Sequence, residues 1–532
     1  MIKIKCKIDE REYTSYTFYN SDTLEELDNI KINPINYKLF NQDIFELTSD
    51  NIVDIMHSPI RCMNDIPGIL VLEKNKTFGK YKNKFYYKCI PDDIRLPVFL
   101  ALYKPKINFN KIQHNKYVIF KYKHWTGKHP IATITNSLGD INKLENFYDY
   151  QLYCKNLHTS IQNFTKTTKK LLKNTSEKEY IKIIDEKYKP EDRTSLNIFT
   201  IDPENCVDID DAFGYECMKN GNIKFSIYIA NVSLWMDVMG IWESFSNRIS
   251  TIYLPDRKRT MLPTVLSDSL CSLHENLIRF AFTLDIVICS KTGKILDYSY
   301  LNTKIKITKN FVYESQELLN MDDYKFSNKL IQNLNKRYPY LNNINDSHDF
   351  IAYIMILMNY LTAKKLAMGK VGIFRSVKST ENNTTNNIPK DISKFLKMWN
   401  SSGSNYTKYK NLESHDILNF ESYIHITSPI RRLVDLLNII IYQNKFNVCE
   451  LSESCHKFLA KLTTDESLNY INTTMRSIRK VQNDCNLLKI CIEDESVINK
   501  IYNGYIFDKL HKNDNLFQYT VYIPLLKMVN RF

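Results

Sequence analysis

The sequence predicts a multidomain α+β protein, with two small β-barrels at its N-terminus, a large mixed α/β domain and a short β segment at its C-terminus. Three observations support this fold class. The chain of 532 residues is too long for one compact core. Apolar–polar alternation, which is typical of strands, dominates residues 1–155 and returns after Gly504. Between these parts, helical and strand periodicities alternate along the chain.

Residues 1–65 and 66–155 are expected to form two consecutive five-strand barrels. The segment IKIKCKI near the N-terminus alternates apolar and polar residues. The second barrel contains three strand-like segments, which are IPGILVLEK, KFYYKCI and KYVIFKYKHW. Its turn signals are Pro91–Asp93, Thr126–Gly127 and Leu138–Asp140.

The rest of the chain divides into three parts. Residues 156–198 are polar and basic and predict a linker with a helix, whose charges form a solvated face. Residues 199–490 predict the mixed α/β domain, and residues 491–532 predict two or three strands of a truncated third barrel. The expected strand faces are Phe225, Ile227 and Ile229, and Phe282, Leu284 and Ile286; the expected helical stripe is Ile351, Ile354, Met355, Met358 and Leu361. We interpret this stripe as core, and residues 455–490 as helical.

Composition and charge favour a protein that binds a polyanion and argue against a secreted or membrane-spanning protein. Lys and Arg number 72 against 59 Asp and Glu, a net charge of +13 that favours a polyanionic partner. The N-terminus has no apolar signal-peptide core, and the longest apolar runs, such as 439–442, are too short to cross a bilayer. The cysteines contain no CxxC pair. We expect an intracellular monomer, cytoplasmic or else nuclear or virion-associated, that is not secreted and binds no membrane.

Four aspartates stand close together in the segment FTIDPENCVDIDDAF, at Asp202, Asp208, Asp210 and Asp211. Asp202 ends a predicted strand, and the other three follow on a turn. Carboxylate oxygens are the ligands that Mg²⁺ or Mn²⁺ prefers, and two such ions about 3.5–4 Å apart can activate water against a phosphodiester. The alternative is an exposed acidic turn. An EF-hand is excluded because the glycine and glutamate of its loop are missing.

A second segment, HITSPIRRLVDLLNIIIY, places Arg431 and Arg432 before an apolar helix that starts near Leu433. Arginines and backbone N–H groups at a helix N-terminus form a good phosphate site. A surface ion pair is the ordinary alternative for such a pair. Together the two segments provide metal ligands and a phosphate clamp, a combination that indicates phosphoryl chemistry.

These residues resemble the motifs of the RNase II/RNase R family of RNB-type exoribonucleases, and more closely its eukaryotic exosome-type members. The resembling blocks are TIDPENCVDIDDA, with the spacing D-x5-D-x-DD, YLPDRKRTMLPTVLSDSLCSL and TSPIRRLVDL. The segments YKCIPDDIRLPVF and KLENFYDYQL, with Trp125, resemble a second cold-shock barrel of the OB type, and KLFNQDIF resembles part of the first. The tail from Asn503 resembles the start of the family's C-terminal OB-type RNA-binding domain.

The resemblance implies a hydrolytic, processive 3′→5′ exoribonuclease that degrades single-stranded RNA to nucleoside 5′-monophosphates. It implies two Mg²⁺ ions, for which Mn²⁺ can substitute, and no small-molecule cofactor. The implied metal ligands are Asp202, Asp208, Asp210 and Asp211, and the implied catalytic residues are Asp210, Asp211 and Arg431. The implied RNA contacts are Arg431 at the phosphate near the scissile bond, Arg432 in support, Tyr313 at the 3′-terminal nucleotide and Tyr253 on the bases.

The chain departs from the family pattern at three places. Ala352 and Tyr353 replace paired glutamates, one of which helps to fix the 3′-terminal residue in the family, while Asn359 is kept. Asn231 replaces an aspartate, and Ile439 and Ile440 replace a histidine and an arginine; we interpret both as structural. We therefore expect an active enzyme. The alternatives are an RNA-binding protein on a degraded nuclease scaffold and a metal-dependent phosphodiesterase that acts on DNA or short oligonucleotides.

Overall fold

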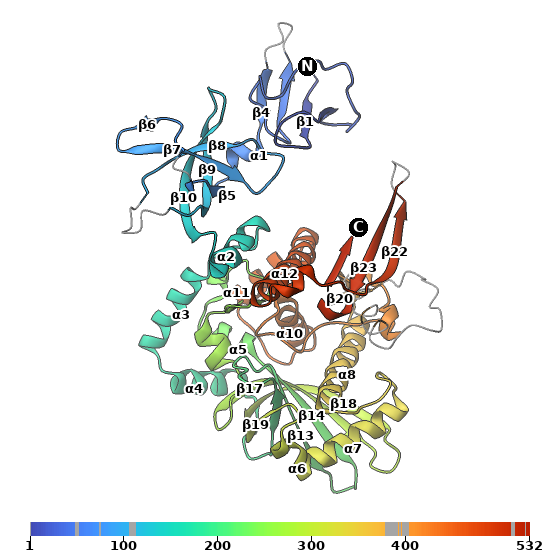
Figure 1. Ribbon diagram of the computed structural model, residues 1–532. Helices are drawn as coiled ribbons and strands as arrows, with labels where there is room; N and C mark the ends of the chain where they lie inside the picture. The colour runs from blue at the N-terminus through green and yellow to red at the C-terminus, as the bar shows by residue number, and fades with distance from the viewer. Residues whose placement is uncertain are drawn as a thin grey trace. The chain divides into compact units, whose positions relative to one another are not determined.

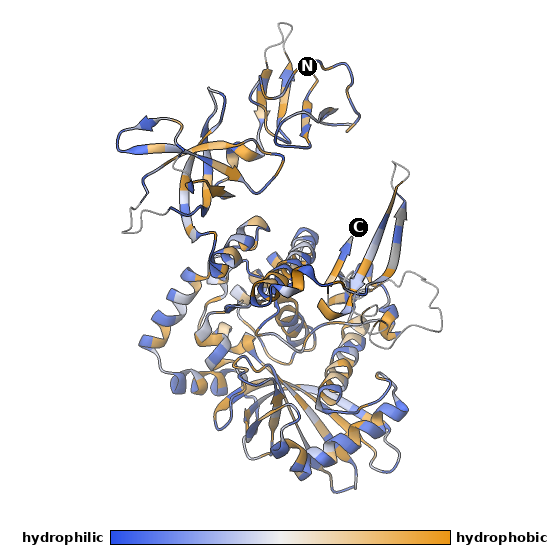
Figure 2. Cartoon of the chain, in the orientation of Figure 1, coloured by the Kyte–Doolittle hydropathy of each residue, from blue (hydrophilic) through white to orange (hydrophobic). Residues whose placement is uncertain are grey.

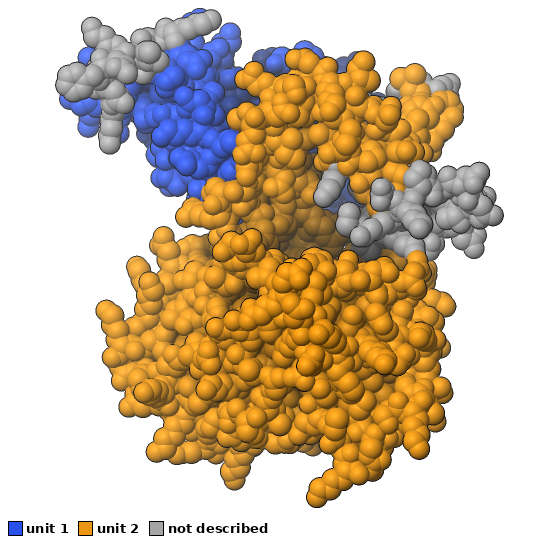
Figure 3. Space-filling view, turned by 60° about the horizontal axis from the view of Figure 1, so that its bottom comes forward, with its two compact units in different colours: residues 1–158 blue, residues 159–532 orange. Residues whose placement is uncertain are grey.

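The computed structural model describes residues 2–47, 53–73, 76–105, 113–377, 392, 395, 404–511, 516–526 and 528–531. The chain forms two compact units, Met1–His158 and Thr159–Phe532, which Figure 3 draws in blue and orange. The first unit contains β-barrel elements, and the second contains a large sheet with helices around it (Figure 1). The predicted fold class, mixed α and β with N-terminal barrels, is confirmed.

The first unit begins with an antiparallel sheet of four strands among the described residues, in the order β2-β1-β3-β4. The strands are β1 (Ile4–Ile8), β2 (Tyr16–Asn20), β3 (Ile44–Leu47) and β4 (Val53–His57), and the short helix α1 (Pro59–Cys62) follows. Ile4, Cys6 and Ile8 are buried, as the alternation in IKIKCKI predicts. The sequence predicts five strands here, of which the structure describes four.

Among the described residues, the second sheet has six strands, in the order β5-β9-β10-β8-β7-β6, and a further pairing of β5 with β7 closes it. The strands are β5 (Ile66–Leu70), β6 (Lys80–Tyr81), β7 (Lys84–Pro91), β8 (Phe99–Tyr103), β9 (Lys116–His124) and β10 (Ile131–Asp140). The sixth strand, absent from the prediction, is the two-residue β6. The predicted turn at Leu138–Asp140 is wrong. These residues belong to β10, where Gly139, at a φ of 129°, lies at a shift of register against β9.

The two barrels of the first unit share one hydrophobic core. Phe40 from the first barrel stacks on Phe99 from the second, with ring centroids 5.8 Å apart. Trp125 lies 4.9 Å from Phe40 and is 6% exposed. Its ring therefore packs in this core and is not a surface for stacking bases. Helix α2 (Leu144–Cys154) ends the unit.

Two helices open the second unit where the sequence predicts a linker and one helix. They are α3 (Gln162–Asn174) and α4 (Glu177–Tyr188). The Ser176 hydroxyl accepts a hydrogen bond from the Glu179 backbone N–H, and the Glu179 carboxylate accepts one from the Ser176 N–H at 2.7 Å. This capping box fixes the start of α4 and separates it from α3.

A mixed sheet of seven strands forms the centre of the second unit, in the order β11-β18-β17-β14-β13-β12-β19 (Figure 1). Its strands are β11 (Glu191–Arg193), β12 (Phe199–Asp202), β13 (Asp211–Cys217), β14 (Ile223–Ala230), β17 (Ile278–Ile288), β18 (Ile295–Lys306) and β19 (Lys309–Val312). The central strands β14 and β17 are almost entirely buried. The predicted strand faces of β14 and β17 are confirmed, since all six of their residues lie in the core.

Helices α7 (Asp322–Arg337) and α8 (Ser347–Met368) pack on this sheet and contribute to the same core. Figure 2 shows hydrophilic residues along much of α7 and more hydrophobic residues along α8. By length and composition α8 could cross a membrane, but 61% of its apolar window is buried inside the protein, as is typical of a core helix. The core interpretation of its methionine stripe is confirmed for Met358, whereas Met355 is partly buried and lines a pocket.

The remaining elements complete the second unit. Helix α10 (Leu433–Lys445) begins at the predicted residue, and two helices, α11 (Glu453–Leu462) and α12 (Asp465–Glu493), occupy the predicted helical region. The C-terminal sheet has three antiparallel strands, β22 (Tyr505–His511), β23 (Phe517–Ile523) and β24 (Met528–Arg531). The shorter elements are α5 (Val232–Val238), α6 (Gln316–Asn320), α13 (Ser496–Asn499), the pair β15 (Ile252–Tyr253) and β16 (Lys258–Arg259), and the pair β20 (Ile373–Ser376) and β21 (Asn405–Lys408).

Candidate active site

The four aspartates meet in one pocket of the second unit, with a volume of about 580 Å³. Strand β12 ends at Asp202 and the adjacent strand β13 begins at Asp211, so the connection 203–210 returns the chain to the same edge of the sheet. The predicted turn is therefore wrong for Asp211, which is the first residue of a strand. Every other predicted site residue also lines this pocket, namely Tyr253, Tyr313, Arg431 and Arg432.

Burial excludes the interpretation of these aspartates as an exposed acidic turn. Asp208 is 8% exposed and Asp210 is 2% exposed. Desolvation raises the pKa of Asp202 to about 6 and that of Asp210 to about 7, although the nearby Arg431 guanidinium opposes both shifts. Desolvation, and then the charges of Asp202 and Asp210, raise the pKa of Asp211 well above its ordinary value. Burial thus disfavours the ionised form of these three carboxyl groups unless a cation compensates their charge.

Arg431 provides positive charge directly at the aspartates. Its Nε lies 3.1 Å from Oδ2 of Asp210, and the Ile430 backbone N–H donates to Oδ1 of the same carboxylate at 2.9 Å. The Arg431 side chain is 45% exposed, so it also faces the open pocket. Arg432 points to a different partner, because its Nη2 donates to Asp435 Oδ1 at 2.8 Å. These contacts fit a direct role for Arg431 and a supporting role for Arg432.

Two side chains from the β15–β16 hairpin reach Asp208. The Tyr253 hydroxyl donates to Oδ2 at 2.9 Å, and Lys258 Nζ donates to Oδ1 at 2.9 Å. The Tyr253 ring itself remains 40% exposed and lines the pocket. Lys258 lies inside a block that resembles the family, but no sequence pattern links it to Asp208, which lies 50 residues away along the chain.

Tyr313 lies beside Asp202 and Asp211. Its backbone N–H donates to the Asp202 carbonyl at 3.2 Å, which continues the parallel pairing of β12 and β19. The Tyr313 ring stacks on the His348 ring, with centroids 3.8 Å apart and planes 12° apart. His348 is the second residue of α8, so this stack connects the start of that helix to the pocket edge. No motif or periodicity in the sequence indicates His348.

The two departures on α8, Ala352 and Tyr353, lie off the face of the helix that lines the pocket. Ile351, Met355 and Asn359, at helical spacing, line the pocket, whereas Ala352 and Tyr353 do not. Tyr353 is fully buried, and its hydroxyl donates to the Tyr338 carbonyl at 3.2 Å. The wall that α8 presents to the pocket is therefore mostly apolar.

The other substitutions are structural, as the sequence predicts. Asn231 is fully buried, and its side-chain amide donates to Asn302 at 2.9 Å. Ile439 and Ile440 are fully buried on α10. Asn359, which matches the family pattern, accepts a hydrogen bond from the Ile426 N–H at 3.0 Å and so connects α8 to the segment before Arg431.

His425 also lines the pocket but has no signature of an acid or base. Arg375 Nη1, which can only donate, lies 2.7 Å from His425 Nε2. The proton of the neutral ring is therefore on Nδ1, which donates to the Tyr406 hydroxyl at 2.7 Å. Desolvation, with the charges of Arg432 and Arg375, holds the pKa of His425 well below its usual value. Its ring supports the segment that carries Arg431.

The chemistry of the carboxylates fits a divalent cation. Oδ2 of Asp202 and Oδ2 of Asp210 are buried and accept no hydrogen bond, so the Arg431–Asp210 contact is an ion pair without good alignment. Such oxygens are the ligands that Mg²⁺ prefers. No three His, Cys, Asp or Glu side chains in the described part of the chain converge as a ready-made metal site. The roles of the four aspartates as ligands therefore stay predictions.

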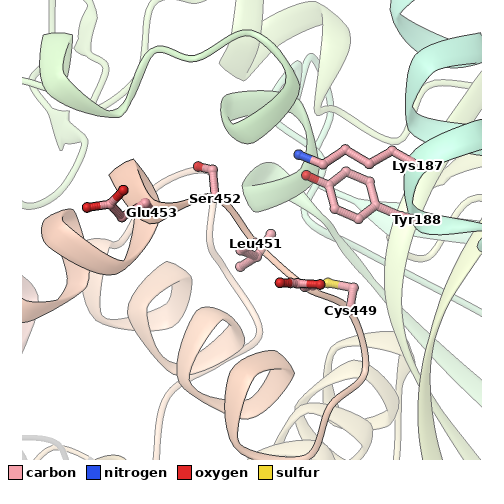
Figure 4. A pocket seen from close by; sticks show the side chains of 7 residues that line it. Lys187, Tyr188, Cys449, Leu451, Ser452 and Glu453 are labelled. Atoms are coloured by element: carbon pink, nitrogen blue, oxygen red, sulfur yellow. The ribbon is translucent and has the colours of Figure 1, made fainter.

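A second pocket, of about 380 Å³, contains none of the predicted residues. Figure 4 shows Lys187 and Tyr188 of α4 opposite the segment that includes Ser452. The buried Asp237 carboxylate accepts hydrogen bonds from Lys187 and from the Trp242 indole at 2.9 Å, and from the Tyr188 and Ser452 hydroxyls. Although burial opposes the shift, these donors lower the pKa of Asp237. These hydrogen bonds join α4, α5 and the start of α11 at one buried carboxylate.

A protein-family model described as the RNB domain matches residues 191–344 and 318–445. An exosome complex exonuclease RRP44 homolog A of Arabidopsis thaliana is 30% identical over 145 residues, which are 27% of this chain and 15% of that protein. Ribonuclease R of Vibrio cholerae is 30% identical over 171 residues, which are 30% of this chain and 20% of that protein. The matched segments thus span a fifth or less of the lengths of these two relatives.

Solved structures share the fold at low identity. Mycoplasma genitalium RNase R in complex with ribose methylated single-stranded RNA has a TM-score of 0.70 and 15% identity, over 99% of this chain and 92% of that chain. Yeast Ssd1, described as a pseudonuclease, has a TM-score of 0.63 and 14% identity, over 100% of this chain and 78% of that chain. Residues 191–445 of this chain therefore form an RNB domain, and the chain is related to ribonuclease R and to the exosome-type exonucleases.

Proposed function

We propose that this chain is a Mg²⁺-dependent hydrolytic exoribonuclease, which degrades single-stranded RNA processively from 3′ to 5′ and releases nucleoside 5′-monophosphates. The observation that carries the proposal is the convergence on one pocket of the four aspartates, Arg431, Arg432, Tyr253 and Tyr313. These residues come from segments as far apart as β12 and α10. The net charge of +13 further favours a polyanionic substrate.

Arg431 is the residue placed to recognise the reacting phosphate. Its Nε faces Asp210, and the part of its side chain that is exposed leaves guanidinium N–H groups toward the pocket. A planar guanidinium that is held by a carboxylate offers preoriented donors to the charge that develops on a phosphodiester oxygen. Asp210 therefore has a positioning role in addition to its proposed role as a ligand.

Asp202 and Asp211 form no ion pair with a protein cation in the described part of the chain. Desolvation raises the pKa of both carboxyls, and their proximity to each other raises that of Asp211 further. Hard cations such as Mg²⁺ or Mn²⁺ stabilise such carboxylates in the ionised form. A bound metal ion would polarise the phosphodiester and lower the pKa of the attacking water.

Tyr313 and Tyr253 are proposed to hold the RNA by stacking. Tyr313 already presents a stacked ring pair with His348, and Tyr253 has an exposed ring at the pocket. Base stacking on aromatic rings tolerates any base, which suits degradation without sequence preference. The apolar wall of Ile351 and Met355 adds surface for a base and no charge against the backbone.

The test uses purified protein, Mg²⁺ and 5′-labelled single-stranded RNA, with single-stranded DNA of the same sequence in parallel. We expect labelled RNA fragments that shorten from the 3′ end, and no such ladder for Asp210→Asn. Cleavage of DNA at an equal rate would favour a general phosphodiesterase instead. Binding of RNA that weakens with salt, without cleavage in Mg²⁺ or Mn²⁺, would favour an RNA-binding protein on a nuclease scaffold.

A further inference from the structure

The four aspartates of the pocket do not share its cations equally. Asp208 pairs with Lys258 and Asp210 pairs with Arg431. Within the described part of the chain, no ion pair reaches Asp202 or Asp211. The four aspartates therefore divide into one pair with protein cations and one pair without them.

The ammonium group of Lys258 is held by two carboxylates, those of Asp208 and Asp268. Its Nζ lies 2.9 Å from Asp208 Oδ1 and 3.0 Å from Asp268 Oδ1, and its side chain is only 21% exposed. Asp268 is fixed in turn, since the Ser267 hydroxyl donates to its Oδ1 at 2.6 Å. Asp268 does not line the pocket, so it can hold the Lys258 ammonium group regardless of what Asp208 binds.

The strand pair β15–β16 also fixes the position of Lys258 relative to Asp208. Tyr253 and Lys258 lie opposite each other in this pair, and the Tyr253 hydroxyl binds the other oxygen of Asp208. The next residue, Arg259, pairs with Asp256 at 2.8 Å, which closes the hairpin between them. Both oxygens of Asp208 are thus engaged by side chains of one short ribbon.

We propose that Lys258, anchored by Asp268, takes the electrostatic place of one of the two divalent cations, so that the pocket binds a single Mg²⁺ at Asp202 and Asp211. An ammonium group at hydrogen-bond distance neutralises Asp208 and occupies an oxygen that a second ion would need. The resemblance to the family implies two ions, and the inference departs from it on this point. It rests on the proposed function only for the identity of the ion.

The test counts Mn²⁺ ions, which are paramagnetic, bound to the full-length protein without RNA, by electron paramagnetic resonance with calorimetry as a second readout. We expect one ion for the wild type and two for Lys258→Met, in which Asp208 is free to bind. Lys258→Arg keeps the charge and should bind one ion. Arg257→Met, an equal loss of charge on the same hairpin at a side chain that is 68% exposed, is the matched control and should also bind one.

Asp268→Asn tests the anchor separately and keeps the lysine. We expect it to bind a second Mn²⁺ at concentrations at which the wild type remains at one, because Lys258 is then held by Asp208 alone. Two ions in the wild type would overturn the inference. A stoichiometry that neither Lys258→Met nor Asp268→Asn changes would also overturn it. Because no RNA is cleaved in this experiment, its result is independent of whether the chain proves to be a nuclease.

Discussion

The Nε atom of Arg431 lies 3.1 Å from Oδ2 of Asp210, and this contact joins the loop after β12 to the residues before α10. The Ile430 N–H binds the other oxygen of the same carboxylate at 2.9 Å. Asp210 therefore positions both the backbone and the side chain of the arginine segment. The two motifs that identify the site in the sequence are physically one unit.

Arg431→Lys should lower kcat by about 100-fold, since a lysine cannot offer the preoriented pair of donors of a guanidinium. Single-turnover cleavage of RNA measures the effect. Arg432→Lys is the comparison. Because Arg432 pairs with Asp435, this substitution should lower kcat by less than about tenfold. Equal losses in the two variants would contradict the assignment of Arg431 to the phosphate.

The raised pKa values of Asp202 and Asp210, about 6 and about 7, predict an unusual dependence of stability on pH. The unfolded chain loses these protons near pH 4, while the folded chain keeps them to higher pH. The folded state thus binds more protons, and in a chelator its stability should fall as the pH rises from about 4 to about 7.

Melting temperatures in a chelator check this, with Asp210→Asn as the control that cannot ionise at this position. The variant should lose less stability than the wild type over the same range of pH. Added Mg²⁺ should restore the wild type most at the upper end of the range, where the carboxylates must ionise to bind it. Parallel curves for the two proteins would contradict the pKa assignment.

Tyr313→Ala should weaken binding of single-stranded RNA by roughly tenfold, because stacking on an aromatic ring contributes about 1–3 kcal/mol per base. Tyr313→Phe keeps the ring and should bind like the wild type. His348→Ala removes the ring that packs on Tyr313 at 3.8 Å and should give a smaller loss. Fluorescence anisotropy with labelled RNA measures all three. An unchanged affinity for Tyr313→Ala would exclude the stacking role.

Asp285→Ala should destabilise the second unit by about 3–5 kcal/mol, because it removes the carboxylate that both terminal nitrogens of the buried Arg193 guanidinium contact and leaves the Glu191 contact to Nε as its remaining ion pair among the described residues. Arg193 is 3% exposed and binds both oxygens of Asp285, at 2.7 and 2.6 Å. Asp93→Ala, which breaks the more exposed pair with Arg95, should cost about 0–1 kcal/mol in the first unit. Urea unfolding midpoints compare the two, and similar shifts would contradict the argument from burial.

Residue patterns within one segment predict those helices and strands whose structure depends mainly on that segment. The alternation of Phe225, Ile227 and Ile229 gives the central strand β14, and the arginine pair marks the start of α10 at Leu433. The Leu138–Asp140 turn fails because a glycine at positive φ also serves a bulge inside a strand, which pairing with β9 decides. The pairing with β9 is a tertiary contact, and no pattern within residues 138–140 indicates it.

The candidate site was predictable in its members but not in their contacts. The spacing of the aspartates marks them as candidate ligands, yet their burial and raised pKa depend on the sheet beneath them. Lys258 and His348 reach the site from positions distant in sequence from Asp208 and Tyr313, so periodicity and motif spacing do not select them. Both become visible only when the chain has folded.

The most direct test of the central claim follows the terminal nucleotide of an RNA labelled at its 3′ end. With Mg²⁺, the wild type should release the label at once as a nucleoside 5′-monophosphate, and Asp210→Asn should release none. Label that stays on the RNA, or that first appears in an oligonucleotide, would contradict an exoribonuclease that begins at the 3′ end.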